Sequence, residues 1–541
     1  MRVLDRLELA RGRGLTLGVL MDRLAAVHCS RRLVTEADGG FSVTFAEAAA
    51  LVDRWAAGVA AQSEPGDRVV VATANGYEQF LLTLAVAKAG RLPAPVNAQM
   101  AAAEIDHVVA DSGATLVVRS AAEVDSSRHH GAAVSTDPRA VGALFYTSGT
   151  TGKPKGAELT HRGLLGGMST AALLPMGARS DEMVLGLPVA HIFGFSAVVG
   201  AACAGVPVYF FSRFNPVRVL DAIEARRSSV LAGVPAMYRM LLEAGAADRD
   251  LTSVRLWISG ADAMPTDLAA RFKRFGASVH LPLVGAVGEA TFAEGYGMVE
   301  TGGGVAVRIS PPFLPTGLGG SVGLPLPGNS FKVVDADGAE VAVGRSGELL
   351  LRGPGVLTGY HGSPEATSAA LTDDGWLRTG DMARRGVLGV INFEGRMKDV
   401  IKRGGYSVYA VEVEQTLEEH PDVLEAAVVA LPDARDGEVP GAAVRLREGA
   451  SLDGLDLGAW ATERLSRYKV PARFVAVDQL PRTGTDKVQR REVVAFFVDG
   501  SEPGPAEAAQ AKKVVARKAT AKGSASKRAP ATKAARRRSR S

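Results

Sequence analysis

Apolar residues along positions 1–395 gather into short runs that alternate with stretches of helical spacing. The run DRVVVATAN (67–75) predicts a buried strand, and YEQFLLTLAVAKAG (77–90) predicts the helix that follows it. Further strands are predicted at 140–147, 208–212, 229–235 and 255–261, and a further helix at 216–227. Strands that alternate with helices indicate an α/β fold of several layers with mainly parallel sheets.

The segment from Met183 to Phe211 contains no charged residue and could be taken for a membrane span. It is interrupted by Pro188, Pro207 and several glycines. A buried strand, helix and strand explain these interruptions better than one long apolar helix.

The pattern changes near residue 396, where helices (410–421 and 457–471) alternate with strands (423–433 and 441–448). We therefore predict a large α/β N-terminal domain over 1–395 and a small α+β C-terminal domain over 396–500. Residues 501–541 are dominated by Ala, Lys, Arg, Ser and Pro and are predicted to be disordered, because they offer too little apolar surface to bury.

Charge is divided unevenly between these parts. Residues 511–541 hold 12 basic and no acidic residues, so residues 1–510 carry 50 basic and 58 acidic side chains, a net charge of −8. The basic tail is either simply solvated or held by nucleic acid or an anionic membrane, and the sequence leaves both open. Two cysteines without a C-x-x-C pair, and a charged N-terminus that excludes a signal peptide, favour a cytoplasmic protein.

The stretch YTSGTTGKPKG (146–156) is rich in glycine, hydroxyl groups and lysine. It is not a Walker A loop, because Gly149 and Gly152 are only three positions apart and Lys153 is followed by Pro154. Its backbone N–H groups and hydroxyls are nevertheless suited to binding phosphate oxygens.

The same stretch resembles the signature of the adenylate-forming superfamily, which includes acyl-CoA synthetases, luciferases and peptide-synthetase adenylation domains. Seven further motifs follow in the family order, and together they cover about 140–492: PVAHIFG (188–194), GADAMP (260–265), EGYGMVETGG (294–303), GELLLRGPGVLTGY (347–360), RTGDMA (378–383), GRMKDVIKRGGYSVYAVEVE (395–414) and PRTGTDKVQRRE (481–492).

The resemblance implies a mobile C-terminal lid and two half-reactions. A carboxylate attacks the α-phosphate of ATP, with Mg²⁺, and gives acyl-AMP and pyrophosphate; the thiol of coenzyme A then gives the thioester and AMP. It places the ATP phosphates on Thr147, Ser148, Gly149, Thr150, Thr151, Gly152 and Lys153 or Lys155. It places the adenosine on Gly260, Ala261, Tyr296, Gly297, Thr301, Asp381 and Arg396, and the metal on Glu300 and Thr150.

The resemblance also assigns roles around the reacting atoms. Lys487 is the expected catalytic lysine, and His191 is expected where the acyl group meets the thiol. Lys398 is the expected hinge, and CoA is expected beside Gly404, Gly405 and Tyr406. Two positions depart from the family: Val299 replaces a threonine, for which Thr301 is the alternative hydroxyl, and Asp486 replaces a glycine.

The acyl pocket is expected among small and apolar residues near 191–195, 234–238, 283–292 and 302–306. These ranges offer no obvious acid to bind an amino group, so a medium- or long-chain fatty acid is favoured over an amino acid, with aryl acids left open. Two alternatives remain: transfer of the acyl group to a carrier protein instead of CoA, and a catalytically weakened homologue tethered by its basic tail.

Overall fold

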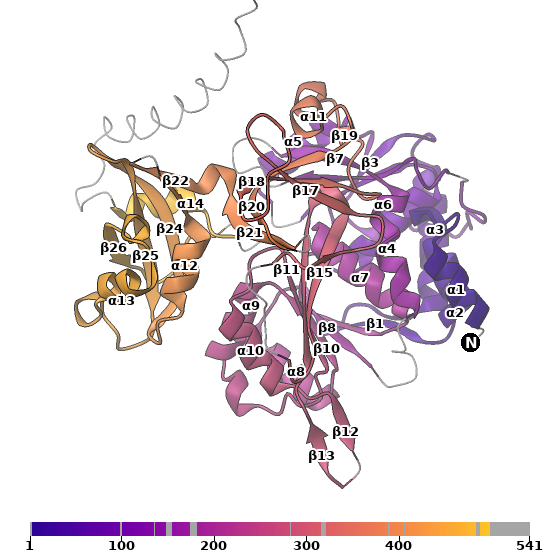
Figure 1. The fold of residues 1–541 in the computed structure, drawn as a ribbon. Helices are drawn as coiled ribbons and strands as arrows, with labels where there is room; N and C mark the ends of the chain where they lie inside the picture. Colours follow the sequence, from indigo (N-terminus) through magenta and orange to yellow (C-terminus); the bar gives the residue numbers. More distant parts are fainter. Residues whose placement is uncertain are drawn as a thin grey trace, which may run out of the picture.

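The computed structural model describes residues 3–97, 100–134, 136–147, 154–173, 181–281, 283–314, 321–387, 390–404, 406–482 and 487–497. A large α/β part contains most of the chain, and a smaller α+β part lies beside it (Figure 1). The predicted fold class is therefore confirmed. The predicted tail, 501–541, lies outside the described residues, and the exact boundaries of the two domains stay predictions.

A nine-stranded sheet forms the centre of the large part. Its strand order is β16 (Leu324–Pro325), β15 (Gly303–Ser310), β14 (Thr291–Met298), β11 (Leu256–Gly260), β10 (Val230–Gly233), β8 (Met183–Leu185), β9 (Val208–Phe210), β1 (Arg32–Glu36) and β2 (Ser42–Thr44). The strands from β14 to β1 are parallel, whereas β15, β16 and β2 pair antiparallel at the two edges.

Helices cover both faces of this sheet. One apolar cluster joins it to α2 (Leu17–His28), α3 (Phe45–Ala60), α4 (Tyr77–Lys88) and α7 (Ile192–Ala204). The other joins it to α8 (Pro216–Arg226), α9 (Pro235–Glu243) and α10 (Thr266–Phe275). Along β11, Trp257 packs in the second cluster and Ile258 against the first, as expected for a strand buried on both faces.

The uncharged segment 183–211 folds as β8, α7 and β9, so the predicted strand, helix and strand are confirmed. Within the described residues, we find no helix with the length and apolar character needed to cross a membrane.

Smaller sheets and helices complete the large part. The sheets are β4 (Leu92–Pro95), β3 (Arg68–Val71) and β5 (Leu116–Val118); β19 (Gly359–Tyr360), β7 (Lys155–Thr160) and β6 (Val141–Thr147); β17 (Ser330–Val334), β18 (Ser346–Arg352), β20 (Leu377–Arg385) and β21 (Ile391–Arg396); and the hairpin of β12 (Val279–Leu281) and β13 (Gly285–Val287). The remaining helices are α1 (Val3–Arg11), α5 (Ala102–Ser112), α6 (His161–Leu165) and α11 (Pro364–Ala370). The predicted strand at 140–147 is thus present as β6, but in an antiparallel sheet.

The small part, which we call the lid, is built on β22 (Val400–Arg403), β23 (Tyr406–Tyr409), β24 (Val423–Asp433), β25 (Gly437–Leu446) and β26 (Arg473–Ala476). Its helices are α12 (Ala410–Glu418), α13 (Leu457–Arg464) and α14 (Arg490–Val493). Two apolar clusters consist of residues from 401–497 alone, so the lid has its own core.

The helix predicted over 457–471 is wrong beyond Arg464. Leu465 is extended, with φ −120° and ψ 151°, and ends α13. The following residues supply carbonyl groups instead: Arg403 Nη1 donates to the oxygens of Tyr468 at 3.2 Å and Val470 at 3.1 Å. The guanidinium therefore ties this segment to β22, which a continuing helix could not allow, because its carbonyls would be used internally.

Candidate active site

The carboxyl ends of three parallel strands bring the predicted site residues together. After β8 the chain reaches His191, after β11 it reaches Ala261, and after β14 it enters the short turn η5 (Val299–Thr301), which contains Glu300. Parallel strands end at the same edge of a sheet, so segments far apart in sequence meet there. The lid lies beside this edge (Figure 1).

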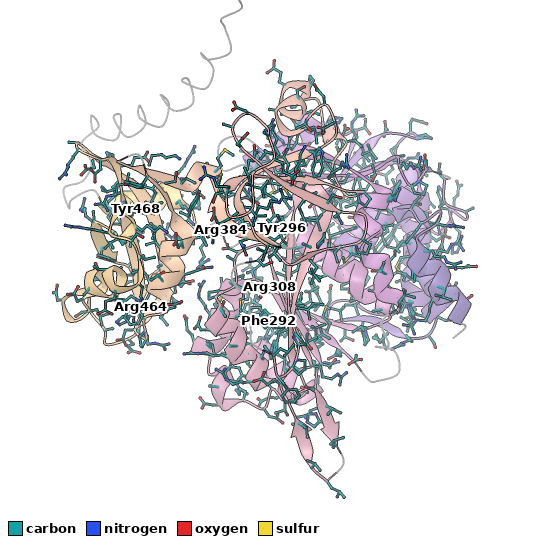
Figure 2. All side chains as sticks on the ribbon, viewed as in Figure 1. Phe292, Tyr296, Arg308, Arg384, Arg464 and Tyr468 are labelled. Atoms are coloured by element: carbon teal, nitrogen blue, oxygen red, sulfur yellow. The ribbon has the colours of Figure 1, made fainter. Side chains whose placement is uncertain are left out.

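Tyr296, Asp381 and Arg396 form a linked group. The Tyr296 hydroxyl donates to Asp381 Oδ2 at 2.5 Å, and Arg396 Nε lies 2.9 Å from Asp381 Oδ1. These residues come from β14, β20 and β21. Figure 2 shows Tyr296, Arg308 and Phe292 one above the other along β14 and β15, with Arg384 of β20 on the side of the view where the lid lies.

The buried carboxylate of Asp381 has one oxygen, Oδ1, that accepts no hydrogen bond from the described residues. Its side chain is 1% exposed, and burial raises the pKa of its carboxyl although the Arg396 charge opposes this. The orientation of Arg396 leaves Oδ1 without a hydrogen bond. A buried carboxylate oxygen of this kind is suited to accepting a hydroxyl from a ligand, as predicted for the ribose, whereas Oδ2 is already used by Tyr296.

Glu300 is held by a tyrosine that the sequence reading did not single out. Tyr360 Oη donates to Glu300 Oε1 at 2.8 Å, and Lys155 Nζ lies 5.4 Å from the centre of the Tyr360 ring. Burial, followed by the nearby charge of Glu300, raises the pKa of Tyr360, so its hydroxyl stays a donor at neutral pH. Glu300 therefore has a fixed orientation before any metal binds.

The predicted nucleotide contact of Thr301 is not supported by its geometry. Thr301 is 2% exposed, its Oγ1 lies 2.9 Å from the oxygen of Met298 and 2.7 Å from that of Gly303, and it accepts from Met298 N at 3.0 Å. The hydroxyl is used to close the turn that carries Glu300, so it cannot replace the hydroxyl absent at Val299.

Glycines and one strained alanine shape the part of the site that is predicted to bind adenosine. A Cβ on Gly297 would lie 2.1 Å from the oxygen of Gly303, so only glycine lets β14 and β15 approach here. A Cβ on Gly260 would lie 3.3 Å from Phe193 Cζ. Ala261 has φ 69°, a conformation that L-residues rarely adopt, and such strain is common at ligand sites.

His191 caps α7 with its side chain. Its Nδ1 accepts from Phe193 N at 3.3 Å, which leaves the proton of the neutral ring on Nε2. Burial, and then the charge of Lys487, lowers the pKa of His191 to about 4. The imidazole is therefore neutral at pH 7 and lies within reach of the Lys487 charge.

Lys487 enters the site from the lid. Burial, and then the positive charge of Arg396, lowers the pKa of its ammonium, while the carboxylates of Asp262, Glu300 and Asp381 act in the opposite direction. Lys487 is thus within electrostatic range of these three carboxylates and of Arg396. The predicted hinge residue, Lys398, lies between β21 of the large part and β22 of the lid, which is where a hinge would need to be.

A buried ionic contact joins the lid to the large part. Arg239 Nη2 of α9 lies 2.7 Å from Glu418 Oε2 of α12, and Arg239 Nη1 lies 3.4 Å from Glu425 Oε1 of β24. The exposed fractions are 18% for Arg239, 11% for Glu418 and 7% for Glu425. Arg445 of the lid also pairs with Glu243 at the edge of this contact.

We expect the free energy of unfolding that Glu418 contributes to fall as pH rises. Burial raises the pKa of Glu418 from 4.5 to about 7, although the Arg239 charge opposes it. The folded protein therefore binds more protons than the unfolded chain between these values, and the stability that Glu418 contributes is present below pH 4.5 and lost as pH rises to about 7. Urea unfolding from pH 5 to 8 should show Glu418→Gln gaining stability relative to wild type as pH rises; parallel curves would contradict the expectation.

Two of the predicted CoA residues, Gly404 and Tyr406, lie on the lid. Gly404 ends the β22 side of a hairpin with φ 53°, and Tyr406 is 59% exposed and stacks on Tyr468 at 4.6 Å.

Several predicted phosphate and CoA residues lie outside the described part of the chain. They are Ser148, Gly149, Thr150, Thr151, Gly152, Lys153 and Gly405, together with the departure at Asp486. Thr147 ends β6 and Lys155 begins β7, so the predicted phosphate loop connects two adjacent strands.

Comparisons with known proteins agree with this geometry. The family described as AMP-binding enzyme matches residues 21–137 and 119–361, and the AMP-binding enzyme C-terminal domain matches 412–487. Feruloyl-CoA synthase from Amycolatopsis sp is 35% identical over 85% of this chain and 95% of its own. Indoleacetate–CoA ligase from Aromatoleum aromaticum is 32% identical over 83% and 92%, and long-chain-fatty-acid–CoA ligase from Bacillus subtilis is 33% identical over 65% and 61%.

A solved structure has the same fold. The o-succinylbenzoate CoA synthetase from Bacillus subtilis, in complex with its acyl-adenylate intermediate, has a TM-score of 0.75 and 28% identity, and the match covers 88% of this chain and 97% of that one.

Proposed function

This chain belongs to the AMP-binding enzymes and is an acid–CoA ligase, and from that premise we propose that it activates a carboxylic acid with a largely apolar tail, a medium- or long-chain fatty acid being the first candidate. The observation that carries the proposal is the position of Lys487 of the lid, which is within electrostatic range of Glu300, Asp381 and Arg396 and of His191.

The first half-reaction needs positioning and charge rather than an enzyme nucleophile. A carboxylate oxygen attacks the α-phosphorus of ATP, the bond to the β-phosphate oxygen breaks, and pyrophosphate leaves with the electron pair. The Lys487 ammonium is suited to stabilising the negative charge on the α-phosphate and the attacking carboxylate. Asp381 and Tyr296 would hold the ribose and adenine, so the reacting atoms are fixed relative to Lys487.

The residues present fit a magnesium ion. Mg²⁺ is commonly bound by one or two carboxylates together with substrate phosphates, and Glu300, oriented by Tyr360, offers such a carboxylate. When bound, Mg²⁺ would neutralise phosphate charge and assist the departure of pyrophosphate.

In the second half-reaction, the sulfur of CoA attacks the acyl carbon, AMP leaves with the electron pair of the broken C–O bond, and the thiol proton is released. The neutral ring of His191 adds no second positive charge beside Lys487 and marks where acyl group and thiol would meet. Lid rotation about Lys398 would then bring Gly404 and Tyr406 to this point.

An arylalkanoic acid is the second candidate substrate class. It is favoured by two relatives that match over more than nine tenths of their own lengths and are named for feruloyl and indoleacetate groups. Of the two relatives named for fatty acids, the long-chain-fatty-acid–CoA ligase matches over 61% of its own length and a fatty acid–[acyl-carrier-protein] ligase over 87%.

The proposal is tested by CoA-dependent AMP formation with straight-chain fatty acids, arylalkanoic acids and amino acids. We expect turnover with acids of the first two classes and none with amino acids. Pyrophosphate release without thioester formation would indicate a carrier protein as the acceptor, and no pyrophosphate with any acid would contradict the activity.

Tyr360→Phe tests the metal position separately. Loss of the hydroxyl that orients Glu300 should raise the Mg²⁺ concentration for half-maximal pyrophosphate release by about 10-fold, as is usual when a hydrogen bond behind a metal ligand is removed. Tyr209→Phe in β9 is the matched control, since that ring stacks under Arg226 on the far side of the sheet. An unchanged Mg²⁺ dependence in Tyr360→Phe would show that the bond from Tyr360 does not support metal binding at Glu300.

A further inference from the structure

The hairpin of β12 and β13 projects from the large part. It connects α10 to the start of β14, at the edge of the central sheet opposite the candidate active site, and Figure 1 shows it extending below α8 and α10. Its two strands pair with each other and with no other described strand. Residues 283–287, which the sequence placed near the acyl pocket, therefore lie away from the site. An isolated two-stranded hairpin is only marginally stable in water, so a contact that covers it is expected.

Polar and apolar side chains of the hairpin lie on opposite faces. Val279 pairs with Val287, and Leu281 lies two positions along from Val279, so these three share one face and His280 lies on the other. His280 Nε2 accepts from Arg227 Nη2 at 3.2 Å, which ties the polar face to the end of α8. The apolar face is left exposed, by 36% at Val279 and 45% at Leu281.

Exposure is greatest beside the turn of the hairpin. Leu283 is fully exposed and Val284 is 69% exposed. Leu283 has φ 70°, a backbone conformation that is rare for leucine and that glycine, asparagine or aspartate adopts more easily. A fully exposed leucine makes no packing contact that would offset this strain, so the side chain points to a contact outside the folded chain.

Charge is absent from the hairpin and present at its base. Residues 275–288 contain no Asp, Glu, Lys or Arg. At the base, Arg274 in the last turn of α10 is exposed, and so is Arg227. The acids there are paired: Asp250 lies 2.5 Å from Arg227, and Glu289 lies 3.5 Å from a buried lysine. An apolar tip with arginines behind it suits a lipid surface, because the tip can enter the headgroup layer while an arginine reaches phosphate.

A lipid surface fits this hairpin better than a second protein chain. Stable protein interfaces bury roughly 800 Å² on each partner, and the few exposed aliphatic side chains of the hairpin fall short of this even when fully covered. Each strand has three residues. At about 3.3 Å per residue they reach about 10 Å, which is comparable with the depth of the headgroup layer. Deeper insertion is unfavourable, because the outer strand edges carry unpaired backbone groups.

We propose that the β12–β13 hairpin docks this protein on a phospholipid membrane. Leu281, Leu283 and Val284 enter the headgroup layer, and Arg274 lies against lipid phosphate. A contact of this size gives weak and reversible binding. Because the hairpin lies at the edge of the sheet opposite the candidate active site, the contact does not cover that site.

Co-sedimentation of the full chain with phosphatidylcholine vesicles tests the proposal. This lipid has no net charge, so attraction of the basic residues in 511–541 to the vesicles is weak. Leu283→Asp combined with Val284→Asp should lower the vesicle partition coefficient by at least about 10-fold, because binding scales with the apolar area inserted. Tm should not fall, since both side chains are exposed and aspartate tolerates the positive φ at 283.

Val343→Asp combined with Val387→Asp is the matched control. These valines are 56% and 70% exposed and lie in the connections between β17 and β18 and between β20 and β21, so binding should be unchanged. A second measurement reports the position of the tip. The fluorescence of Leu283→Trp should shift to the blue on adding vesicles and be quenched by brominated lipid, whereas that of Val343→Trp should show neither change.

Three results would overturn the proposal. One is equal partition of wild type and the hairpin variant into phosphatidylcholine vesicles, or no partition of either. Another is binding only to vesicles that contain phosphatidylglycerol and only through electrostatic attraction, unchanged in the hairpin variant, which would assign the membrane contact to the basic tail. The third is a wild-type dimer that the hairpin variant converts to a monomer, without vesicle binding, which would make the hairpin an interface with a second copy.

Discussion

Replacing Lys487 with alanine should lower the rate of acyl-AMP formation by about 10²–10³-fold, the usual effect of removing one preorganised charge or donor from a developing anion. We expect this loss because Lys487, which the lid contributes, is within electrostatic range of Glu300, Asp381 and Arg396. Thioester formation from chemically prepared acyl-AMP should change little, because the α-phosphate charge no longer develops in that step. The measurement is pyrophosphate release beside single-turnover thioester formation.

Lys332→Ala is the control for the loss of a lysine. Lys332 lies on β17, 3.7 Å from Asp374 and over the Trp376 ring, and the Lys332→Ala variant should retain both half-reactions.

Burial lowers the pKa of Lys487 below the ordinary value of a lysine. As pH is raised, the wild-type adenylation rate should therefore begin to fall before the ordinary lysine pKa is reached, because the ammonium loses its proton. Equal losses in both half-reactions of Lys487→Ala would mean that this lysine supports the fold or the lid rather than the adenylation step.

Arg239→Met should lower adenylation by a comparable factor without touching a reacting atom. It leaves Glu418 buried without its cation, whereas Glu425 keeps Arg445 and Arg482, and breaking a buried pair in this way typically costs about 3–5 kcal/mol. Because the pair joins α9 to the lid, its loss should destabilise the lid position in which Lys487 lies in the site. Thioester formation from prepared acyl-AMP should be retained, since it needs a different lid position.

A second substitution separates this effect from general damage. Arg239→Met combined with Glu418→Gln should recover part of the adenylation rate, because the uncompensated charge of Glu418 is removed. Arg249→Met is the control, since Arg249 pairs with Asp221 and Glu224 within the large part near the surface and should change the rate little. A double variant no better than Arg239→Met alone would argue against coupling between the two residues.

The parts of the fold that were predicted correctly are those in which the spacing of apolar side chains indicates a strand or a helix. The runs at 67–75 and 77–90 became β3 and α4, and 183–211 became β8, α7 and β9. The extension of the central sheet by β14 and β15 was not predicted as strands. These strands contain several glycines, which leave no side chain to form an alternating pattern, and it is the absence of side chains that lets the two strands approach.

The candidate site was predicted as a set of residues but not as a set of contacts. The motifs indicated Tyr296, Glu300, Asp381 and Lys487, yet the bond from Tyr360 to Glu300 joins positions 60 residues apart. The pair of Arg239 and Glu418 joins positions 179 residues apart, and nothing in either local sequence indicates it. Tyr360 could have been found, because it ends the quoted motif GVLTGY; the hydroxyl of Thr301 could not, because only the closed turn shows that it is already used.

The central claim is that the acid is activated as an adenylate, and the fate of the carboxylate oxygen tests it most directly. An acid labelled with ¹⁸O in both carboxylate oxygens, incubated with the protein, ATP, Mg²⁺ and CoA, should pass one labelled oxygen to the phosphate of AMP. The pyrophosphate should carry no label. Label recovered in inorganic phosphate, together with ADP, would mean attack at the γ-phosphate and would contradict the account.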